Sequence, residues 1–535
     1  MKESTIKYLL LISPILVLLI GLSLQPRYEI YSGETLFNGE RAYSYLKYLT
    51  SRYRYRVVGS QACKNASLWI KSFFEKLGYK PVTQVFSVKD FTGKLVNGTN
   101  IYVVKKGVVD RYIVIVAHFD IVPKTIEGAN DNGAGVSILL ELARVFVNRS
   151  TYFSIIFLAC DAEEVGLKGS EYFAKTFKEI DKVEAAISID MCGWKETKGV
   201  ELIAYYDSWT FSDAGLLVLF LSANSLGYEV TVGFDQFLSR ILGFTFAGTD
   251  SMSFIGKNIP ALGITDYPLY PYWHTPEDTI DKVSPEKLMT VGTLTERIIL
   301  TIDKLKGVPK IGVHYLILNN NIVLYQELIY GLLLAFILHP IAEFLWLGKK
   351  GAKAIKGAVL TLVFFLVVAC SLVAVTYTMS LFKTFIEPLI IGILTLVTVL
   401  KIIGKRLDIE WIHIKKTSIA GSLALYSLSI INPVSGLMLL SPLLVASSVV
   451  KPVKGLKKYI TATVMVLLCL SPVLILFYAI AIEFNLGLLV YYIPLFFSWL
   501  LYHYTSFYVI LVLLLSSYIT VLALTVNAII KTIQD

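Results

Sequence analysis

The C-terminal part of the chain, residues 322–530, is almost continuously apolar, whereas residues 27–310 have the mixed composition of a soluble domain. A helix of about 20 apolar residues crosses the ~30 Å hydrocarbon core of a bilayer, and a bilayer admits only helices or closed barrels. We therefore expect eight membrane spans, near residues 326–347, 358–379, 385–403, 418–432, 434–450, 459–482, 486–503 and 506–530.

Another apolar run lies at residues 8–24, preceded by Lys2 and Lys7. A cleaved signal peptide and a retained anchor both begin in this way. No small-x-small cleavage site follows the run, so we favour a retained anchor. The predicted domains are an N-terminal anchor (1–26), a soluble-type domain (27–310) and an all-α transmembrane domain of about eight helices (311–535).

Short basic loops at residues 349–357, 401–416 and 451–458 separate alternate pairs of the expected spans. Basic loops stay on the cytoplasmic side of a membrane. This rule predicts a multi-pass protein in a lipid bilayer, with a cytoplasmic N-terminus and with residues 25–325 in an extracellular or lumenal space.

The same loops explain the formal net charge of +9, because many Lys and Arg residues lie in them and not on a polar domain. We therefore expect no nucleic-acid partner. Three Asn-x-Ser/Thr tripeptides, beginning at Asn65, Asn97 and Asn148, are candidates for glycosylation and lie in the predicted exterior domain.

Strand and helix patterns alternate within residues 112–193. Buried strands are predicted at 112–120, 153–164 and 183–193, and helices at 136–148 and 169–179. Strands that are apolar throughout, with helices between them, are typical of a parallel sheet covered on both faces. The predicted fold class is α/β, with a mostly parallel central sheet flanked by helices.

Residues of the types that bind metals follow these strands. They are His118 and Asp120 after the first strand, Asp131 in a Gly-rich loop, Glu163 and Glu164 after the second strand, Asp190 after the third, and His274 in a later loop. Functional sites of open α/β sheets form at the carboxyl ends of the strands. Each residue alone has an ordinary structural explanation, such as a turn for Asp131, but their arrival at one sheet edge favours a site.

Histidine nitrogens and carboxylate oxygens are normal zinc ligands. Two His with three carboxylates suit two divalent ions that share one carboxylate, and ions about 3.5–4 Å apart activate one water together. Asp120 can accept the second imidazole N–H of His118 and orient the ring. One of the adjacent glutamates can bind metal while the other acts as a base.

The segments HFD, GANDNGAGV, DAEEVGLKGS, SID, GTDSMSF and HTPEDT resemble the di-zinc family that includes bacterial secreted aminopeptidases and glutamate carboxypeptidases. The resemblance covers about residues 40–305 and implies two zinc ions and a peptide substrate. It implies that His118, Asp131 and Asp190 hold one zinc, and that Asp131, Glu164 and His274 hold the other. Glu163 would be the general base and Asp120 the partner of His118.

One position departs from this family, in which a Tyr commonly precedes the last His and stabilises the oxyanion. This chain has Trp273 there, and Tyr272 or Tyr270 are the alternatives. Together with Asp250 of the GTDSMSF segment, Trp273 and Tyr272 are our candidates for contacts with the oxyanion or substrate. The whole layout resembles the Fxna-type endoplasmic-reticulum metallopeptidases and the yeast vacuolar membrane protease.

Three functions compete for this sequence. The favoured one is a membrane-anchored zinc metallopeptidase, most simply an aminopeptidase. The alternatives are a single-zinc enzyme similar to glutaminyl cyclases and an inactive peptidase domain that serves as a membrane chaperone or binds partners. The complete ligand set favours the first, and the sequence leaves the oligomeric state, the native metal and the side-chain preference open.

Overall fold

The computed structural model describes residues 3–206, 210–233, 248–318 and 322–348, together with seven single positions between 419 and 445. Contacts divide the chain into two compact units. One is Leu24–Gln326, and the other combines Met1–Ser23 with Glu327–Asp535.

The second unit contains two long described helices, α1 (Glu3–Ser23) and α10 (Gln326–Gly348). Within the described ranges, no helix combines the length and the apolar character that crossing a membrane requires. The spans predicted at 8–24 and 326–347 therefore gain no support. The spans predicted from residue 358 onward lie outside the described residues, apart from the seven single positions.

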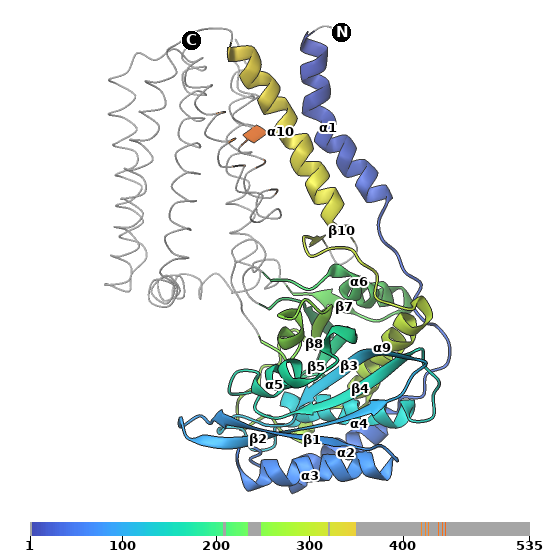
Figure 1. Ribbon diagram of the computed structural model, residues 1–535, viewed down its shortest axis with the longest axis vertical. Helices are drawn as coiled ribbons and strands as arrows, with labels where there is room; N and C mark the ends of the chain where they lie inside the picture. Colours follow the sequence, from blue (N-terminus) through green and yellow to red (C-terminus); the bar gives the residue numbers. More distant parts are fainter. Residues whose placement is uncertain are drawn as a thin grey trace, which may run out of the picture. The chain divides into compact units, whose positions relative to one another are not determined.

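The unit Leu24–Gln326 is built on an eight-stranded sheet (Figure 1) with the order β1-β2-β4-β3-β5-β8-β6-β7. The strands are β1 (Val82–Lys89), β2 (Leu95–Lys105), β3 (Val109–His118), β4 (Phe153–Cys160), β5 (Val183–Ile189), β6 (Gly199–Ile203), β7 (Val230–Val232) and β8 (Ala261–Tyr267). The central strands β4, β3, β5 and β8 are parallel, whereas β1–β2, β2–β4 and β6–β8 pair antiparallel. The predicted mixed α/β sheet is therefore present, with antiparallel additions on both sides of its parallel centre.

Alternate residues of the central strands enter two separate cores. Ile113 and Ile115 of β3 belong to the larger core, whereas Val114 and Val116 belong to the smaller one. Successive side chains of a strand point to opposite faces of a sheet. The continuous apolar runs of the sequence are thus explained by burial on both faces.

Helices cover both faces of this sheet. The larger core contains residues of α2 (Gly39–Arg52), α3 (Gln61–Lys76), α4 (Gly135–Phe146), α6 (Ala214–Ser222) and α9 (Pro285–Leu305). The smaller core contains Phe173 of α5 (Lys168–Thr176) and Phe254 of α8 (Met252–Ile255). Short turns η1 (Ala129–Ala134), η2 (Ile180–Lys182), η3 (Ala223–Leu226) and η4 (Ile280–Lys282) and a two-stranded pair, β9 (Leu316–Leu318) and β10 (Ile322–Leu324), complete the described elements.

The parallel strands end together at one edge of the sheet. His118 at the end of β3 is in register with Cys160 at the end of β4, and Val116 is in register with Ser188 of β5. The strands end two to four residues earlier than the predicted strands. Asp120, Glu163, Glu164 and Asp190 therefore lie in the loops that follow the strands, where backbone turns bring them together.

Candidate metal centre

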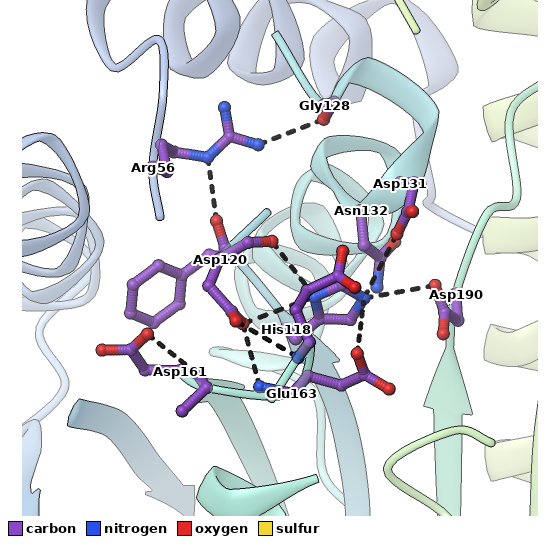
Figure 2. A network of polar contacts seen from close by, with 12 residues as sticks. Arg56, His118, Asp120, Gly128, Asp131, Asn132, Asp161, Glu163 and Asp190 are labelled. Atoms are coloured by element: carbon purple, nitrogen blue, oxygen red, sulfur yellow. Dashed lines mark hydrogen bonds and ion pairs between the residues drawn. The ribbon is translucent and has the colours of Figure 1, made fainter. Parts of the chain in front are cut away.

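His118 is the centre of a first group of ligands. Its side chain is buried, and its Nε2 lies 3.4 Å from Asp190 Oδ1 and 3.5 Å from Asp131 Oδ1. Glu163 Oε2 lies 4.0 Å from the same nitrogen. Figure 2 shows these three carboxylates converging on the same ring nitrogen, Nε2.

His274 forms a second group from the loop after β8. Its Nε2 lies 2.9 Å from Glu164 Oε2 and 3.5 Å from Asp131 Oδ2. The two oxygens of Asp131 thus face two different histidines, which is the geometry of a carboxylate that bridges two ions. The structure brings together all five ligands that the sequence predicts.

Asp120 supports both groups. Its Oδ1 and its backbone carbonyl oxygen lie 3.5 Å and 3.3 Å from His118 Nδ1. Its carboxylate also accepts the backbone N–H groups of Glu163 at 3.1 Å and of Glu164 at 3.3 Å. The predicted orientation of His118 by Asp120 agrees with this geometry, and the hold on the two glutamates is a second role that the sequence did not reveal.

Burial and crowding perturb the acids of the cluster. Burial raises the pKa of Glu164 to about 8, with further contributions from Asp120 and Asp190. Burial also raises the pKa values of Asp131 and Glu163 well above their usual range. Burial lowers the pKa of His118, but Glu163 and Asp190 outweigh it and raise that pKa well above its usual value. Bound cations would reverse this repulsion among carboxylates.

A further observation indicates that the cluster suits zinc. Glu164 Oε1 is buried and has no hydrogen-bond partner among the described residues. A buried polar atom without a partner carries a free-energy cost, which a metal ion would remove. Two sets of three residues, His118–Glu163–Asp190 and His118–Asp131–Glu164, each bring one ligand atom to within 4.8 Å of one another. Nitrogen and oxygen ligands at this spacing suit zinc.

The Gly-rich loop that carries Asp131 is packed against its neighbours. Gly128 has a φ of 55°, and a Cβ there would lie 2.3 Å from Ile121 Cγ2. Asn132 donates from Nδ2 to the Ile189 carbonyl oxygen at 2.8 Å and accepts from the Gly135 N–H at 2.9 Å. These contacts fix the loop between the end of β5 and the start of α4.

Asp278 holds the same loop from another side. Its carboxylate accepts the backbone N–H groups of Asn130 at 2.8 Å and of Asp131 at 3.1 Å, and the hydroxyl of Tyr270 at 2.9 Å. Asp278 lies four residues after His274 in the HTPEDT segment, so that segment supplies both a ligand and a support. The sequence analysis did not identify Asp278, although its place in the motif was a usable signal.

Two tyrosines and a tryptophan precede His274 in the chain. Tyr270 is fully buried and donates its hydroxyl to Asp278, so Tyr270 is unsuited to the oxyanion contact that we considered for it. Trp273 is 41% exposed, and its ring centroid is 4.2 Å from that of His274. Tyr272 is half-buried, with Lys282 Nζ 5.3 Å from its ring centroid.

Asp250 lies in the loop before α8 and is buried. Neither of its carboxylate oxygens has a partner with normal hydrogen-bond geometry in the described part of the chain, although the Ser170 hydroxyl is near enough to oppose the rise of the Asp250 pKa. Burial raises its pKa to about 6. A buried carboxylate of this kind suits a contact with a polar group of a ligand. The three glycosylation candidates Asn65, Asn97 and Asn148 are all exposed, and their modification stays a prediction.

The fold and the site together define a mixed α/β domain with a cluster of His and carboxylate ligands at the edge of its sheet. Residues 100–299 match the model of a known family, described as Peptidase family M28. The match includes every predicted ligand, and it supports the resemblance to zinc peptidases that the motifs indicated.

Curated relatives of this chain include named peptidases and one cyclase. The chain is 33% identical to Aminopeptidase YwaD of Bacillus subtilis over 207 residues, which are 37% of this chain and 42% of that protein. It is 29% identical over 229 residues to Aminopeptidase NAALADL1 of Rattus norvegicus, covering 37% of this chain and 30% of that protein. It is 22% identical over 210 residues to Glutaminyl-peptide cyclotransferase of Drosophila melanogaster, covering 34% of this chain and 59% of that protein. In each case the match spans less than two thirds of the relative's length.

Solved structures show a weaker likeness. A zinc aminopeptidase from Bacillus subtilis, BSAP, matches with a TM-score of 0.43 and 18% identity, covering 50% of this chain and 95% of that one. A glutaminyl cyclase from an Acidobacteriales bacterium matches with a TM-score of 0.44 and 24% identity, covering 52% of this chain and 100% of that one.

Proposed function

We propose that this chain is a zinc metallopeptidase that hydrolyses peptide bonds at a two-metal site. The observation that carries the proposal is the position of Asp131, whose two oxygens lie 3.5 Å from His118 Nε2 and 3.5 Å from His274 Nε2. His118, Asp131 and Asp190 would hold one zinc, and Asp131, Glu164 and His274 the other. Two zinc ions held there would lower the pKa of a bound water and would polarise a carbonyl group.

The residues of the chain then have distinct tasks. Glu163 belongs to the first group but is not one of the zinc ligands that we propose. We assign it the role of general base, which accepts a proton from the attacking water and returns it to the leaving amine. Asp120 holds His118 in the correct ring orientation and fixes the backbone of both glutamates. Trp273 can donate one hydrogen bond to the developing oxyanion but cannot act as an acid.

Aminopeptidase activity is the specific form that we propose. The relatives named aminopeptidases favour it. The buried Asp250 carboxylate and the half-buried Tyr272 are our candidates for contacts with the substrate. The relative named as a cyclotransferase makes cyclisation of N-terminal glutamine the competing reaction to test.

We further propose that the chain is a multi-pass membrane protein and that residues 27–310 lie outside the cytoplasm. The support is the set of apolar runs, the three basic loops at 349–357, 401–416 and 451–458, and the basic N-terminal residues Lys2 and Lys7. Three exposed glycosylation candidates are consistent with an exterior domain.

A panel of substrates tests the reaction. The purified full chain, loaded with zinc, is incubated with free aminoacyl peptides, with the same peptides N-acetylated, and with peptides that begin with glutamine. We expect hydrolysis of every peptide with a free amino terminus, no hydrolysis of the N-acetylated peptides, and no cyclisation of the peptides that begin with glutamine. Cyclisation without hydrolysis would assign the chain to the cyclase reaction, and inertness toward all three would favour the non-enzymatic alternative.

A further inference from the structure

We propose that Arg56 is a positioning residue of the metal centre, which sets the distance between the loop that follows β3 and the loop that carries Asp131. This inference rests on the proposed two-metal function. Arg56 lies between α2 and α3, far from the ligands in sequence, and its side chain is fully buried. None of the family segments that we quoted contains it.

The guanidinium group of Arg56 connects two loops through their backbones. Its Nε donates to the Phe119 carbonyl oxygen at 2.8 Å. Its two terminal nitrogens donate to the carbonyl oxygens of Glu127 at 2.6 Å and of Gly128 at 3.1 Å. Phe119 stands between the ligand His118 and its partner Asp120, and Gly128 is three residues before Asp131 (Figure 2). One side chain thus contacts both loops next to their functional residues.

An arginine suits this task better than a lysine. The guanidinium presents five N–H donors in a rigid planar fork, whereas the ammonium of lysine is a compact charge on a flexible stem. A fourth carbonyl oxygen, that of Tyr53, accepts from the same terminal nitrogen that binds the Glu127 carbonyl oxygen, at 3.2 Å. The backbone of Arg56 also contacts the loop that follows β3, because the Ile121 N–H donates to the Arg56 carbonyl oxygen at 3.2 Å.

A buried charge of opposite sign holds the other side of the Asp131 loop. Arg56 binds the carbonyl oxygens of Glu127 and Gly128, whereas Asp278 binds the N–H groups of Asn130 and Asp131. Hydrogen bonds to charged groups are roughly twice as strong as neutral ones. The loop is therefore fixed from both sides within five residues, and Asp131 is placed with little freedom.

The charge of Arg56 also matters to the cluster. Burial lowers the pKa of Arg56 to about 10, with Asp278, Asp120 and Asp131 among the acids that oppose this effect. The side chain therefore stays cationic at neutral pH. No ion pair within 4.0 Å ties Arg56 to a single carboxylate in the described part of the chain, so its cation acts on the site at longer range while its hydrogen bonds act on the backbone.

The test compares Arg56→Met and Arg56→Lys in the full chain with a control, Arg149→Met. Arg149 is a largely buried arginine that pairs with Glu296 just beyond the far end of α4, so its loss should cost stability without reaching the metal loops. Zinc affinity is measured by competition with a chromophoric chelator, cobalt-substituted protein is examined by visible absorption, and kcat and KM are determined separately.

We expect both Arg56 variants to bind zinc about 10–100-fold more weakly, as losses of supporting residues around metal ligands usually do. The cobalt spectrum should change and kcat should fall more than KM rises, while Arg149→Met keeps the zinc affinity and spectrum of the unmodified chain. If Arg56→Met does not fold, Arg56→Lys decides by the same readouts. Unchanged zinc affinity and spectrum, or equal changes in Arg149→Met, would overturn the inference. An unmodified chain that binds no zinc would instead overturn the proposed function.

Discussion

Glu163 and Glu164 are neighbours in the chain, yet their side chains serve different histidines. Glu163 Oε2 lies 4.0 Å from His118 Nε2, whereas Glu164 Oε2 lies 2.9 Å from His274 Nε2. Both backbone N–H groups bind the Asp120 carboxylate, so a single acid fixes the point from which the two side chains diverge. This divergence agrees with the roles that we propose, in which Glu163 is the base and Glu164 is a zinc ligand.

Glu163→Gln should keep its zinc but lose turnover. The amide is nearly isosteric with the carboxylate and cannot accept a proton from water, and general-base catalysis is worth about 10²–10⁴-fold in rate. The measurement is peptide hydrolysis at matched zinc content. A variant within a few-fold of the unmodified chain would show that Glu163 is not the base.

Asp131→Asn should be more harmful than Asp120→Asn. Asp131 is proposed to touch both ions, so its replacement should empty or disorder the pair, whereas Asp120 acts through His118 and should cost about 10–100-fold. Zinc content and hydrolysis of both variants are compared after circular dichroism has shown equal folding. A fully active Asp131→Asn protein with both ions would mean that Asp131 is only a turn residue.

The residues of the cluster and the support of His118 by Asp120 were predictable from the sequence, but the other supporting residues were not predicted. His118, Asp131, Glu163, Glu164 and Asp190 could be predicted because parallel strands deliver their following residues to one sheet edge. Arg56 and Asp278 act instead by hydrogen bonds to the backbone of other loops. The approach of those loops depends on the packed structure, which residue spacing does not encode. Tyr270 was considered for the oxyanion for the same reason, since its bond to Asp278 is invisible in sequence.

At the scale of elements, the central strands and their two helices were predictable because continuous apolar runs report burial on both faces. The predicted strands at 112–120 and 153–164 extend beyond β3 and β4 because apolar composition does not mark where pairing stops. Helices α4 and α5 agree with the helices predicted at 136–148 and 169–179 to within three residues. The antiparallel pairing of β6 with β8 is long-range, and it was not predicted.

Asp266 connects β8 with η1 and with the loop that follows β5, and it should make the stability of the fold sensitive to pH. It lies in β8 and accepts the Trp194 N–H at 3.0 Å and Asn130 Nδ2 at 2.9 Å. Burial raises its pKa from 3.8 to about 7. The folded state thus binds this proton more tightly than the unfolded state, so the contribution of Asp266 to stability is present below pH 3.8 and is lost as the pH rises to about 7.

Asp266→Asn should therefore flatten the fall in the free energy of unfolding between about pH 4 and pH 7. Each pKa unit corresponds to about 1.4 kcal/mol of free energy of unfolding. The measurement is the urea midpoint of zinc-free protein at several pH values, for the variant and the unmodified chain. Parallel pH profiles for the two proteins would contradict the assignment.

At the scale of the whole molecule, the proposed topology makes a prediction about access. In intact cells, an impermeant amine reagent should label the exposed Lys47 of the domain, whereas Lys353 of the first basic loop should be labelled only after permeabilisation. The chain should also resist extraction with alkaline carbonate. Labelling of Lys353 but not of Lys47 in intact cells would show that the topology is the reverse of the one proposed. Release of the chain by carbonate would show that it is not an integral membrane protein.

The two-metal site is the central claim for the whole molecule, and zinc stoichiometry tests it most directly. The purified full chain is assayed for hydrolysis, and its zinc is quantified by elemental analysis as chelator removes the metal and added zinc restores it. Two zinc ions per active chain are expected, because the Asp131 carboxylate lies between His118 and His274 and each histidine has a further carboxylate beside it. Activity should disappear with the metal and return with it. Full activity with one zinc ion per chain, or with none, would contradict the account.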